Sequence, residues 1–254
     1  MVGRIKNMIK NMKNPEQFRR LRMWQGRLDI ALAAYDLERR HMDTKEAYYN
    51  GTREVQKNPN SKKSPTKLAS NVRNIVYELI ESQVDNSIPM PKVRPIHPED
   101  IELAKSIEKA LVNEISKIKY KDINDEQERV TPIQGGDFFH VQWDSTAGMH
   151  CTLGDVSVEE VYPKQVIPQP CVTELEKMDY VFLIFSQTKD FIKKRYGVNV
   201  EDAIEDRPDI RNQNDTTYND DIVSQYIAYY RNKNGGIGMF SWVEDYILVD
   251  FEDY

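Results

Sequence analysis

A helix-forming stretch that runs directly into closely spaced prolines restricts this chain more than any other feature. Residues 66–86 repeat apolar side chains at helical spacing, and Pro89, Pro91 and Pro95 follow shortly afterwards. Proline has no backbone N–H to donate, and it disfavours helix in the residue before it. The sequence therefore predicts an amphipathic helix over residues 66–86 that passes into an extended strap.

Two further segments, residues 16–40 and 98–118, also repeat apolar side chains at near-helical spacing. Pro15 and Pro98 fit the first turn of each helix, where the missing N–H has no partner to lose. We therefore expect long helices to dominate the first half of the chain.

After Pro132 the spacing of apolar residues is typical of β-strands instead of helices. Gly235 and Gly236 follow Asn234 between two apolar runs, which is typical of a hairpin turn. Helices that precede a run of strands indicate an α+β fold with a mixed or antiparallel sheet. The expected elements are a strand at 137–144, short proline-broken strands at 159–168, a buried strand at 178–186, a short helix at 188–196 closed by Gly197, and strands at 222–230 and 240–251.

The composition is polar and the charge is uneven. Hydrophobic residues make up 39% and charged residues 30%, so we expect an elongated shape or surfaces that partners cover. Residues 1–27 contain eight Lys/Arg and one acid, whereas residues 200–254 contain thirteen acids and four Lys/Arg. The net charge of −6 argues against a conventional nucleic-acid-binding protein, which is usually basic. It is compatible with a conduit that passes DNA without gripping it.

The sequence offers no membrane or secretion signal. No apolar run approaches the roughly 20 residues that a membrane-spanning helix needs. Residues 1–13 alternate basic and apolar side chains and lack the continuous core of a signal peptide. We expect a protein made in the cytosol, without a membrane partner.

One cluster of metal-ligating residue types stands out. His150 and Cys151 follow His140 along the chain, but they lack the paired spacing that zinc sites usually have. The second cysteine, Cys171, lies too far from Cys151 for a CxxC pair. We predict ordinary strand or loop residues here, with no metal and no disulfide scaffold.

Enzymatic motifs are weak throughout. Glu128, Asp137 and Asp144 could chelate Mg²⁺ for nuclease chemistry, yet no lysine or histidine completes a diagnostic arrangement. Gly135-Gly136 and the GGIG of residues 235–238 fit turns better than phosphate loops. We therefore predict no catalytic residue and no cofactor.

Two charged segments have open interpretations. The basic residues 1–27 could bind phosphate or acidic lipid, or their apolar positions could dock on a neighbouring subunit; we favour docking or disorder. The acidic residues 201–221 could face a DNA channel or a basic partner; we favour a solvated loop.

A series of short motifs occurs in a fixed order between residues 35 and 254. No single motif is specific, but their order and spacing resemble the portal proteins of tailed bacteriophages, especially those of Gram-positive hosts. The motifs are Tyr48–Arg53 (YYNGTR), the helix at 71–86 with Ile88–Lys92 (IPMPK), Glu128-Arg129 before Gly135-Gly136-Asp137 and Val141–Asp144 (VQWD), Gly154–Val156 with Pro163–Pro168 (PKQVIP), and Tyr180-Val181 with Lys189–Gly197 (KDFIKKRYG).

The resemblance implies a domain layout. Residues 1–170 would form the portal wing, residues 171–214 a strand and short helix at the first stem crossing, and residues 215–254 a hairpin at the start of the clip. Glu128-Arg129 would lie on a helix that leads into the following strand. Portal proteins are longer, so we expect an amino-terminal fragment or a truncated prophage copy.

The resemblance also implies partners. The chain would form a ring of about twelve copies with head-to-tail interfaces. The ring would bind the terminase large subunit, the major capsid or scaffolding protein and a head-completion adaptor, and pass double-stranded DNA. Its place would be the virion vertex, and the host cytoplasm during assembly. Two alternatives stay open: a metal-dependent nuclease of a mobile element, and a monomeric nucleic-acid or membrane adaptor.

Overall fold

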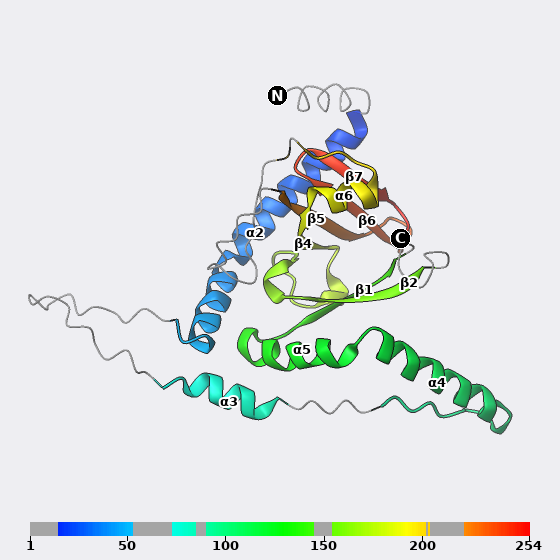
Figure 1. Ribbon diagram of the computed structural model, residues 1–254. Coiled ribbons are helices and arrows are strands. Elements are labelled where there is room, and N and C mark those ends of the chain that lie inside the picture. Colours follow the sequence, from blue (N-terminus) through cyan, green and yellow to red (C-terminus); the bar gives the residue numbers. More distant parts are fainter. Residues whose placement is uncertain (1–14, 53–72, 85–89, 145–153, 202, 204–220) are drawn as a thin grey trace, which may run out of the picture. The chain divides into compact units, whose positions relative to one another are not determined.

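The computed structural model describes residues 15–52, 73–84, 90–144, 154–201, 203 and 221–254 (Figure 1). The fold is α+β, as the sequence predicts, and the sheets are antiparallel. The chain divides into two compact units, one of residues 1–40 and 162–254 and one of residues 41–161. The long helix α2 (Pro15–Tyr49) contributes residues to both units.

A five-stranded antiparallel sheet forms the first unit. Its strands follow one another in chain order, so each strand pairs with the next along the sequence. Consecutive antiparallel strands need only short turns between them. The strands are β3 (Val166–Pro168), β4 (Tyr180–Thr188), β5 (Ile222–Arg231), β6 (Ile237–Val243) and β7 (Tyr246–Phe251), with 3₁₀ turns η3 (Pro163–Gln165) and η4 (Leu175–Lys177).

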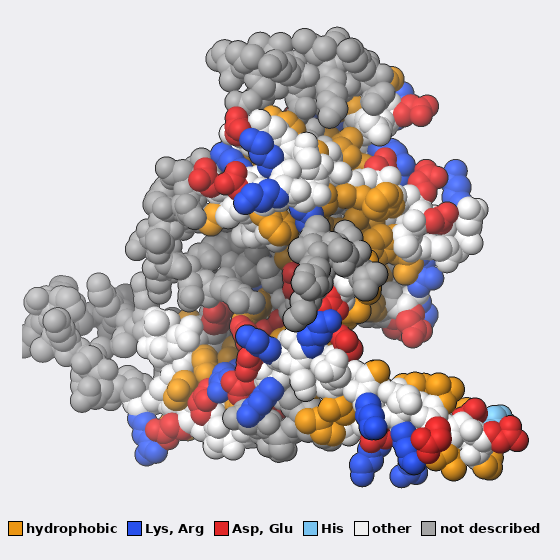
Figure 2. All heavy atoms as spheres, turned by 45° about the vertical axis from the view of Figure 1, so that its right-hand side comes forward, with side chains coloured by type: hydrophobic (Ala, Val, Ile, Leu, Met, Phe, Trp, Pro, Cys, Tyr) orange, Lys and Arg blue, Asp and Glu red, His pale blue; other side chains and the backbone are white. Residues whose placement is uncertain are grey.

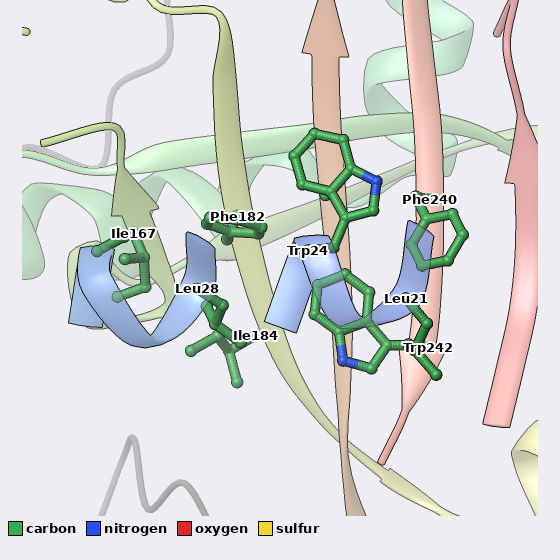
Figure 3. Packing of buried hydrophobic residues seen from close by; sticks show 10 residues of the cluster. Leu21, Trp24, Leu28, Ile167, Phe182, Ile184, Phe240 and Trp242 are labelled. Atoms are coloured by element: carbon green, nitrogen blue, oxygen red, sulfur yellow. The ribbon is translucent and has the colours of Figure 1, made fainter. Parts of the chain in front are cut away.

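Helix α2 packs its apolar stripe on one face of this sheet (Figure 3). Successive strand residues point to opposite faces, so alternate residues line the face under the helix. Trp24 is the centre of this core and makes an edge contact with Phe182 at a centroid distance of 6.0 Å. The buried cluster comprises Leu21, Trp24, Leu28 and Ala31 of α2 with Ile167, Phe182, Ile184, Ala228, Phe240 and Trp242 of the strands.

A second apolar cluster forms around the short helix α6 (Lys189–Tyr196). Ile192 of this helix packs with Val223 and Val243, whose odd positions place them on the sheet face opposite to Ala228 and Trp242. The helix begins at Thr188, whose hydroxyl accepts a hydrogen bond from Phe191 N at 3.2 Å. It ends at Gly197, which has the left-handed φ of +67° that this residue tolerates.

The second unit contains helices and a two-stranded ribbon. Lys119, with a φ of +52°, separates the helix that ends at Lys117 from the helix that begins at Tyr120. Gly135, with a φ of +97°, ends the second of these helices. The elements are α3 (Ile75–Gln83), the 3₁₀ turn η1 (Pro98–Asp100) running into α4 (Ile101–Lys117), α5 (Tyr120–Gln134), and the antiparallel strands β1 (Phe138–Asp144) and β2 (Asp155–Val161).

Most predicted elements are confirmed, with shifted ends for two helices. The helix predicted over 16–40 continues to Tyr49, where the predicted Asn50-Gly51 turn follows. The helix predicted over 66–86 begins only at Ile75 in its described part, because the Asn74 side chain accepts a hydrogen bond from Tyr77 N and caps it. Residues 90–95 form neither helix nor strand, in agreement with the predicted strap.

Two elements differ from the sequence-based expectation. The apolar pattern predicts no helix over residues 119–134, yet α5 forms there; only the portal resemblance implied a helix at Glu128-Arg129. The segment 240–251 was expected as one strand, but it divides into β6 and β7 at a tight turn where Glu244 has a φ of +46°. Most of the acidic segment 201–221 lies outside the described residues.

The boundaries of the two compact units differ from those of the three regions expected from the sequence. Residues 171–214 and 215–254 were expected as separate regions, but β4 and β5 pair along their whole length in one sheet. Residues 1–170 are shared between the two units. The assignment of wing, stem and clip stays a prediction.

Candidate assembly surface

The strap lies along α4 and leaves an apolar surface exposed. Val93 N donates a hydrogen bond to the Glu108 carboxylate at 3.2 Å, which fixes the strap to the helix. Ala104 is buried, but Leu103, Ile107 and Leu111 follow at four-residue intervals and are 59%, 43% and 42% exposed. Side chains four residues apart lie on the same face of a helix, so these three form one stripe.

The strap has exposed side chains of its own. Met90 is 59% exposed and Ile96 is 91% exposed, and the strap also contributes Lys92 and Arg94 but no acid. We call the set Met90, Lys92, Arg94, Ile96, Leu103, Ile107 and Leu111 the strap–α4 surface. Figure 2 shows orange side chains along α4, at the lower right of the view.

The ribbon of β1 and β2 presents a second exposed apolar face. Val141 pairs with Val158 and Trp143 pairs with Val156, and paired residues of antiparallel strands project from the same face. We call Phe139, Val141, Trp143, Val156 and Val158 the ribbon face. Val141 and Trp143 are 62% and 60% exposed, so the centre of the ribbon face has no cover in the described chain.

Gly154 sets the position of the Trp143 ring. A Cβ at residue 154 would lie 2.7 Å from Trp143 Nε1, and Gly154 has a φ of +73°. Only glycine allows both this close approach and this backbone conformation without strain. The indole of Trp143 is therefore held against the backbone of Gly154 while its remaining surface stays open.

Charged side chains lie beside both apolar surfaces. Of the four acids in the ribbon strands, only Glu160 shares the ribbon face, and the other three (Asp144, Asp155 and Glu159) project from the opposite face. The strap contains Lys92 and Arg94, and the acids Glu99, Asp100 and Glu102 follow it. Lys117 Nζ at the end of α4 lies 2.6 Å from Asp155 Oδ2, and this hydrogen bond lowers the pKa of the Asp155 carboxyl.

A polar network joins three helices of this unit. Tyr49 donates a hydrogen bond from its hydroxyl to Glu81 Oε1 at 2.6 Å, and Arg129 Nε donates to the same oxygen at 3.0 Å. Arg129 also pairs with Asp125 one turn earlier on α5. The network ties the end of α2 to α3 and α5.

The network perturbs the ionisation of its members. Burial, followed by the hydrogen bond to Glu81, raises the pKa of Tyr49 to about 12. The hydrogen bonds from Tyr49 and Arg129 lower the pKa of Glu81, and those to Asp125 and Glu81 raise the pKa of Arg129. These residues are 32 and 48 positions apart in the sequence, so no local pattern could have pointed to the network.

Helix α3 exposes most of the apolar stripe of the predicted amphipathic helix. Ile80 is buried, but Ile75 and Leu79 are each 58% exposed. Asn74 Nδ2 also donates to the carbonyl of Tyr49, which fixes the start of α3 to the end of α2. The apolar stripe read from the sequence is real, and most of it faces outward.

The candidate metal residues do not converge in the described part of the chain. Among the described residues, no group of three His, Cys, Asp or Glu side chains could hold a metal ion. Asp137, His140 and Asp144 lie at the start, middle and end of the β1 segment, and Glu128 lies on α5. His150 and Cys151 lie outside the described residues, and Cys171 is an exposed free thiol.

The glycine-rich segment at 235–238 forms the predicted hairpin turn. Gly235 has a φ of +84° in the turn between β5 and β6. A Cβ at Gly238 would lie 2.3 Å from Tyr230 Cζ, so the ring of Tyr230 lies directly over this residue. The glycines of the GGIG sequence therefore allow the positive φ at Gly235 and the close approach of the Tyr230 ring to Gly238.

A cavity of about 550 Å³ lies in the other unit, beside α2 and the β5–β6 turn. Arg27 stacks on Trp24 with its guanidinium carbon 4.9 Å from the ring centroid. Lys233 lies on the cavity wall together with the acids Asp179 and Asp253. The mixture of charges does not favour one class of ligand.

No model of a known protein family matches this chain, and no curated protein matches it either. A search of the described helices finds none that is both long and apolar enough to span a membrane.

Proposed function

We propose that this chain is a structural subunit of a bacteriophage portal ring, which forms the DNA channel at one vertex of the capsid. The observation that carries the proposal is the uncovered apolar surface of residues 41–161. Among the described residues of this unit, sixteen large hydrophobic side chains are exposed and five hydrophobic residues are buried. A protein that works alone rarely leaves such patches in water.

The order of sequence motifs supports the same proposal. The described structure places a helix at Glu128-Arg129 and leads it into the strand that contains Val141–Asp144, which is the succession that the portal resemblance implies. It also places a strand at Tyr180-Val181 and a short helix in residues 189–196.

In the proposed role the protein acts by assembly. Each subunit contacts its neighbour through two different surfaces, and such head-to-tail contacts close into a ring when the rotation permits. The ring would pass double-stranded DNA and dock the terminase, whose ATP hydrolysis drives packaging. It would later bind the head-completion adaptor in the virion.

The molar mass of the purified protein tests the proposal. Light scattering behind a sizing column, over a range of protein concentrations and salt, is expected to give about twelve times the 29.7 kDa of one chain. Negative-stain electron microscopy of the same fraction should show rings with a central opening. A mass of one chain at every concentration would contradict ring formation by this protein.

The same preparation separates the two alternatives. A monomeric adaptor predicts salt-sensitive DNA or vesicle binding that is lost when residues 1–14 are deleted. The deletion must stop there, because Leu21 and Trp24 belong to the core. A nuclease predicts Mg²⁺-dependent DNA cleavage that Asp137→Asn or Asp144→Asn abolishes.

A further inference from the structure

The five-stranded sheet has an open edge at β7. In the described part of the chain, β7 is the last strand of the sheet and pairs with β6 on one side. An edge strand presents unpaired N–H and C=O groups, and proteins commonly cover such an edge or guard it with particular residues. The sequence of β7 contains neither proline nor lysine, so the strand lacks two of the usual guards.

Helix α2 crosses the sheet and begins at this edge. Figure 3 shows the helix passing over the strands, with Leu28 beside Ile184 of β4 and Leu21 beside Trp242 of β6. Strand β7 lies one strand spacing, about 4.8 Å, beyond β6. Pro15 lies about 9 Å beyond Leu21 along the helix axis, so the first turn of α2 projects past β7.

Two ion pairs fix the start of α2 on β7 and the turn before it. Arg20 Nη1 lies 3.1 Å from Asp250 Oδ1, and Arg22 Nη2 lies 3.5 Å from Asp245 Oδ1. Asp250 pairs with Phe240 in the sheet, so its carboxylate projects from the face that α2 covers. Basic side chains of α2 therefore already lie on the acids of this edge.

The edge is acidic beyond those two pairs. Residues 244–254 contain five acids and no Lys/Arg. The five acids are Glu244, Asp245, Asp250, Glu252 and Asp253. The Glu252 side chain is 79% exposed, although it also lies 3.4 Å from Arg20. A covering segment with basic side chains would therefore be attracted to this edge.

The chain supplies such a segment at this place. Residues 1–14 lie outside the described residues and lead directly into Pro15. They contain four basic residues and no acid; the basic residues are Arg4, Lys6, Lys10 and Lys13. Fourteen residues span about 21 Å as a helix and about 46 Å when extended, whereas the six residues of β7 span about 20 Å. In either conformation the segment is long enough to cover the strand.

We propose that residues 1–14 cover the open edge of β7 in the same chain, with their basic side chains against the acids of residues 244–253. The occupant is the chain's own segment, because it starts where α2 passes this edge and is held there at a high effective concentration. The contact continues the one that Arg20 and Arg22 already make. The inference concerns one chain and does not depend on the proposed ring.

The docked segment has two consequences. It covers the unpaired backbone groups of β7, so that the sheets of two copies do not join edge to edge. It also occupies the basic side chains that could otherwise bind phosphate or acidic lipid.

Crosslinking in the full chain tests the location of the segment. Cys151→Ser and Cys171→Ser remove the native thiols, and Met8→Cys and Glu252→Cys introduce one thiol in the segment and one at the edge. A short bismaleimide bridges thiols that lie close together without requiring the strict geometry of a disulfide. Mass spectrometry of the digested monomer identifies the bridged pair, and circular dichroism of each variant confirms that it folds.

The matched control moves the second thiol onto α2 with Arg19→Cys. Arg19 is exposed and is closer to Met8 along the chain than Glu252 is. Helical spacing places it on the side of α2 opposite to Leu21 and Trp24. A segment without a fixed position would crosslink at both sites, whereas the docked segment should crosslink several-fold more at position 252 than at position 19.

Each outcome decides the proposal. A several-fold preference for position 252 within single chains supports it. Equal yields, or a preference for position 19, would overturn it, because the segment would then not lie on β7. Dimers from a mixture of chains that carry Met8→Cys and Glu252→Cys separately would also overturn it, because the occupant would then be another copy.

Hydrogen exchange of β7 provides a second measurement. Deletion of residues 1–14 keeps the buried residues of α2, which begin at Leu21, and should accelerate exchange of the β7 amides several-fold because their edge is uncovered. The opposite edge strand β3 is the matched control and should be unchanged.

A charge variant of the full chain completes this measurement. Changing the four basic residues of the segment to glutamine should accelerate exchange of β7 as the deletion does. Unchanged exchange of β7 after the deletion would overturn the proposal. Faster exchange after the deletion but not in the charge variant would overturn the part of the proposal that assigns the contact to charge.

Discussion

The two compact units of this protein use their hydrophobic residues in opposite ways. In the part of the chain that the structure describes, the unit of residues 1–40 and 162–254 buries eighteen hydrophobic side chains and exposes eight large ones, whereas the unit of residues 41–161 buries five and exposes sixteen. The first unit closes a core between a helix and a sheet. The second holds its helices with a polar network and keeps its apolar surface outside, which suits a part that is completed by association.

One buried and one exposed tryptophan provide the sharpest test of this contrast. Trp24 is 2% exposed and Trp143 is 60% exposed. Trp24→Ala should lower the free energy of unfolding by about 3–5 kcal/mol, because it leaves a large cavity in the core. Trp143→Ala should lower it by less than about 1 kcal/mol.

Urea unfolding followed by circular dichroism measures both changes, at concentrations below the onset of assembly. Equal losses for the two variants would mean that the ribbon face is covered within one chain, and the contrast between the units would be lost.

Alanine substitutions at two glycines test the side-chain packing of the unit of residues 1–40 and 162–254. Gly238→Ala should destabilise the protein by about 1–3 kcal/mol, because the added methyl would overlap the Tyr230 ring. Gly26→Ala on α2 is the matched control: a Cβ there meets nothing within 4 Å, and the change should stabilise the helix by about 0.5–1 kcal/mol. Thermal unfolding measures both. A stabilising Gly238→Ala would show that the ring of Tyr230 can move away at little cost.

Acid should weaken the stabilisation that the Tyr49–Glu81–Arg129 network gives to the fold. The pKa of Glu81 is lowered in the fold, so its contribution is fully present above the unfolded pKa near 4.5 and disappears as the pH falls through the lower folded pKa. Glu81→Gln should cost about 1 kcal/mol at pH 7, a modest figure because the pair is partly exposed, and should flatten the pH dependence of stability in this window.

Urea unfolding between pH 3 and pH 7 measures this effect. Arg73→Met is the matched control, because it breaks an exposed ion pair with Glu78 on the same helix and should leave stability unchanged. An unaltered pH profile in Glu81→Gln would show that other carboxylates control the acid response.

The smallest expected effect comes from Tyr49 at high pH. Its folded pKa of about 12 exceeds the unfolded value of 10, so its contribution is fully present below pH 10 and is lost as the pH rises towards 12. Tyr49→Phe should remove one late-titrating tyrosine from the ultraviolet absorption titration. An unchanged titration curve would mean that the Glu81 hydrogen bond does not hold the Tyr49 proton.

Much of the fold follows from local pattern. The helices at 16–40 and 98–118, the strand at 178–186, the helix closed by Gly197 and the hairpin at 234–236 could all be predicted, because periodicity and capping act over a few residues. Helix α5 could not be predicted from its pattern, since its sequence is polar and its contacts with Glu81 and β2 come from distant residues. The turn at Glu244 was missed because a non-glycine residue adopts a positive φ there.

The sequence by itself determined most of the helical and extended segments and the α+β class, because these depend on apolar spacing, prolines and caps. The tertiary structure alone decided which apolar stripes are buried. The stripes of α2 and α4 look alike in sequence, yet one meets a sheet and the other meets solvent. Burial depends on what lies opposite a face, and residues far apart in the sequence, or in another copy, supply that surface.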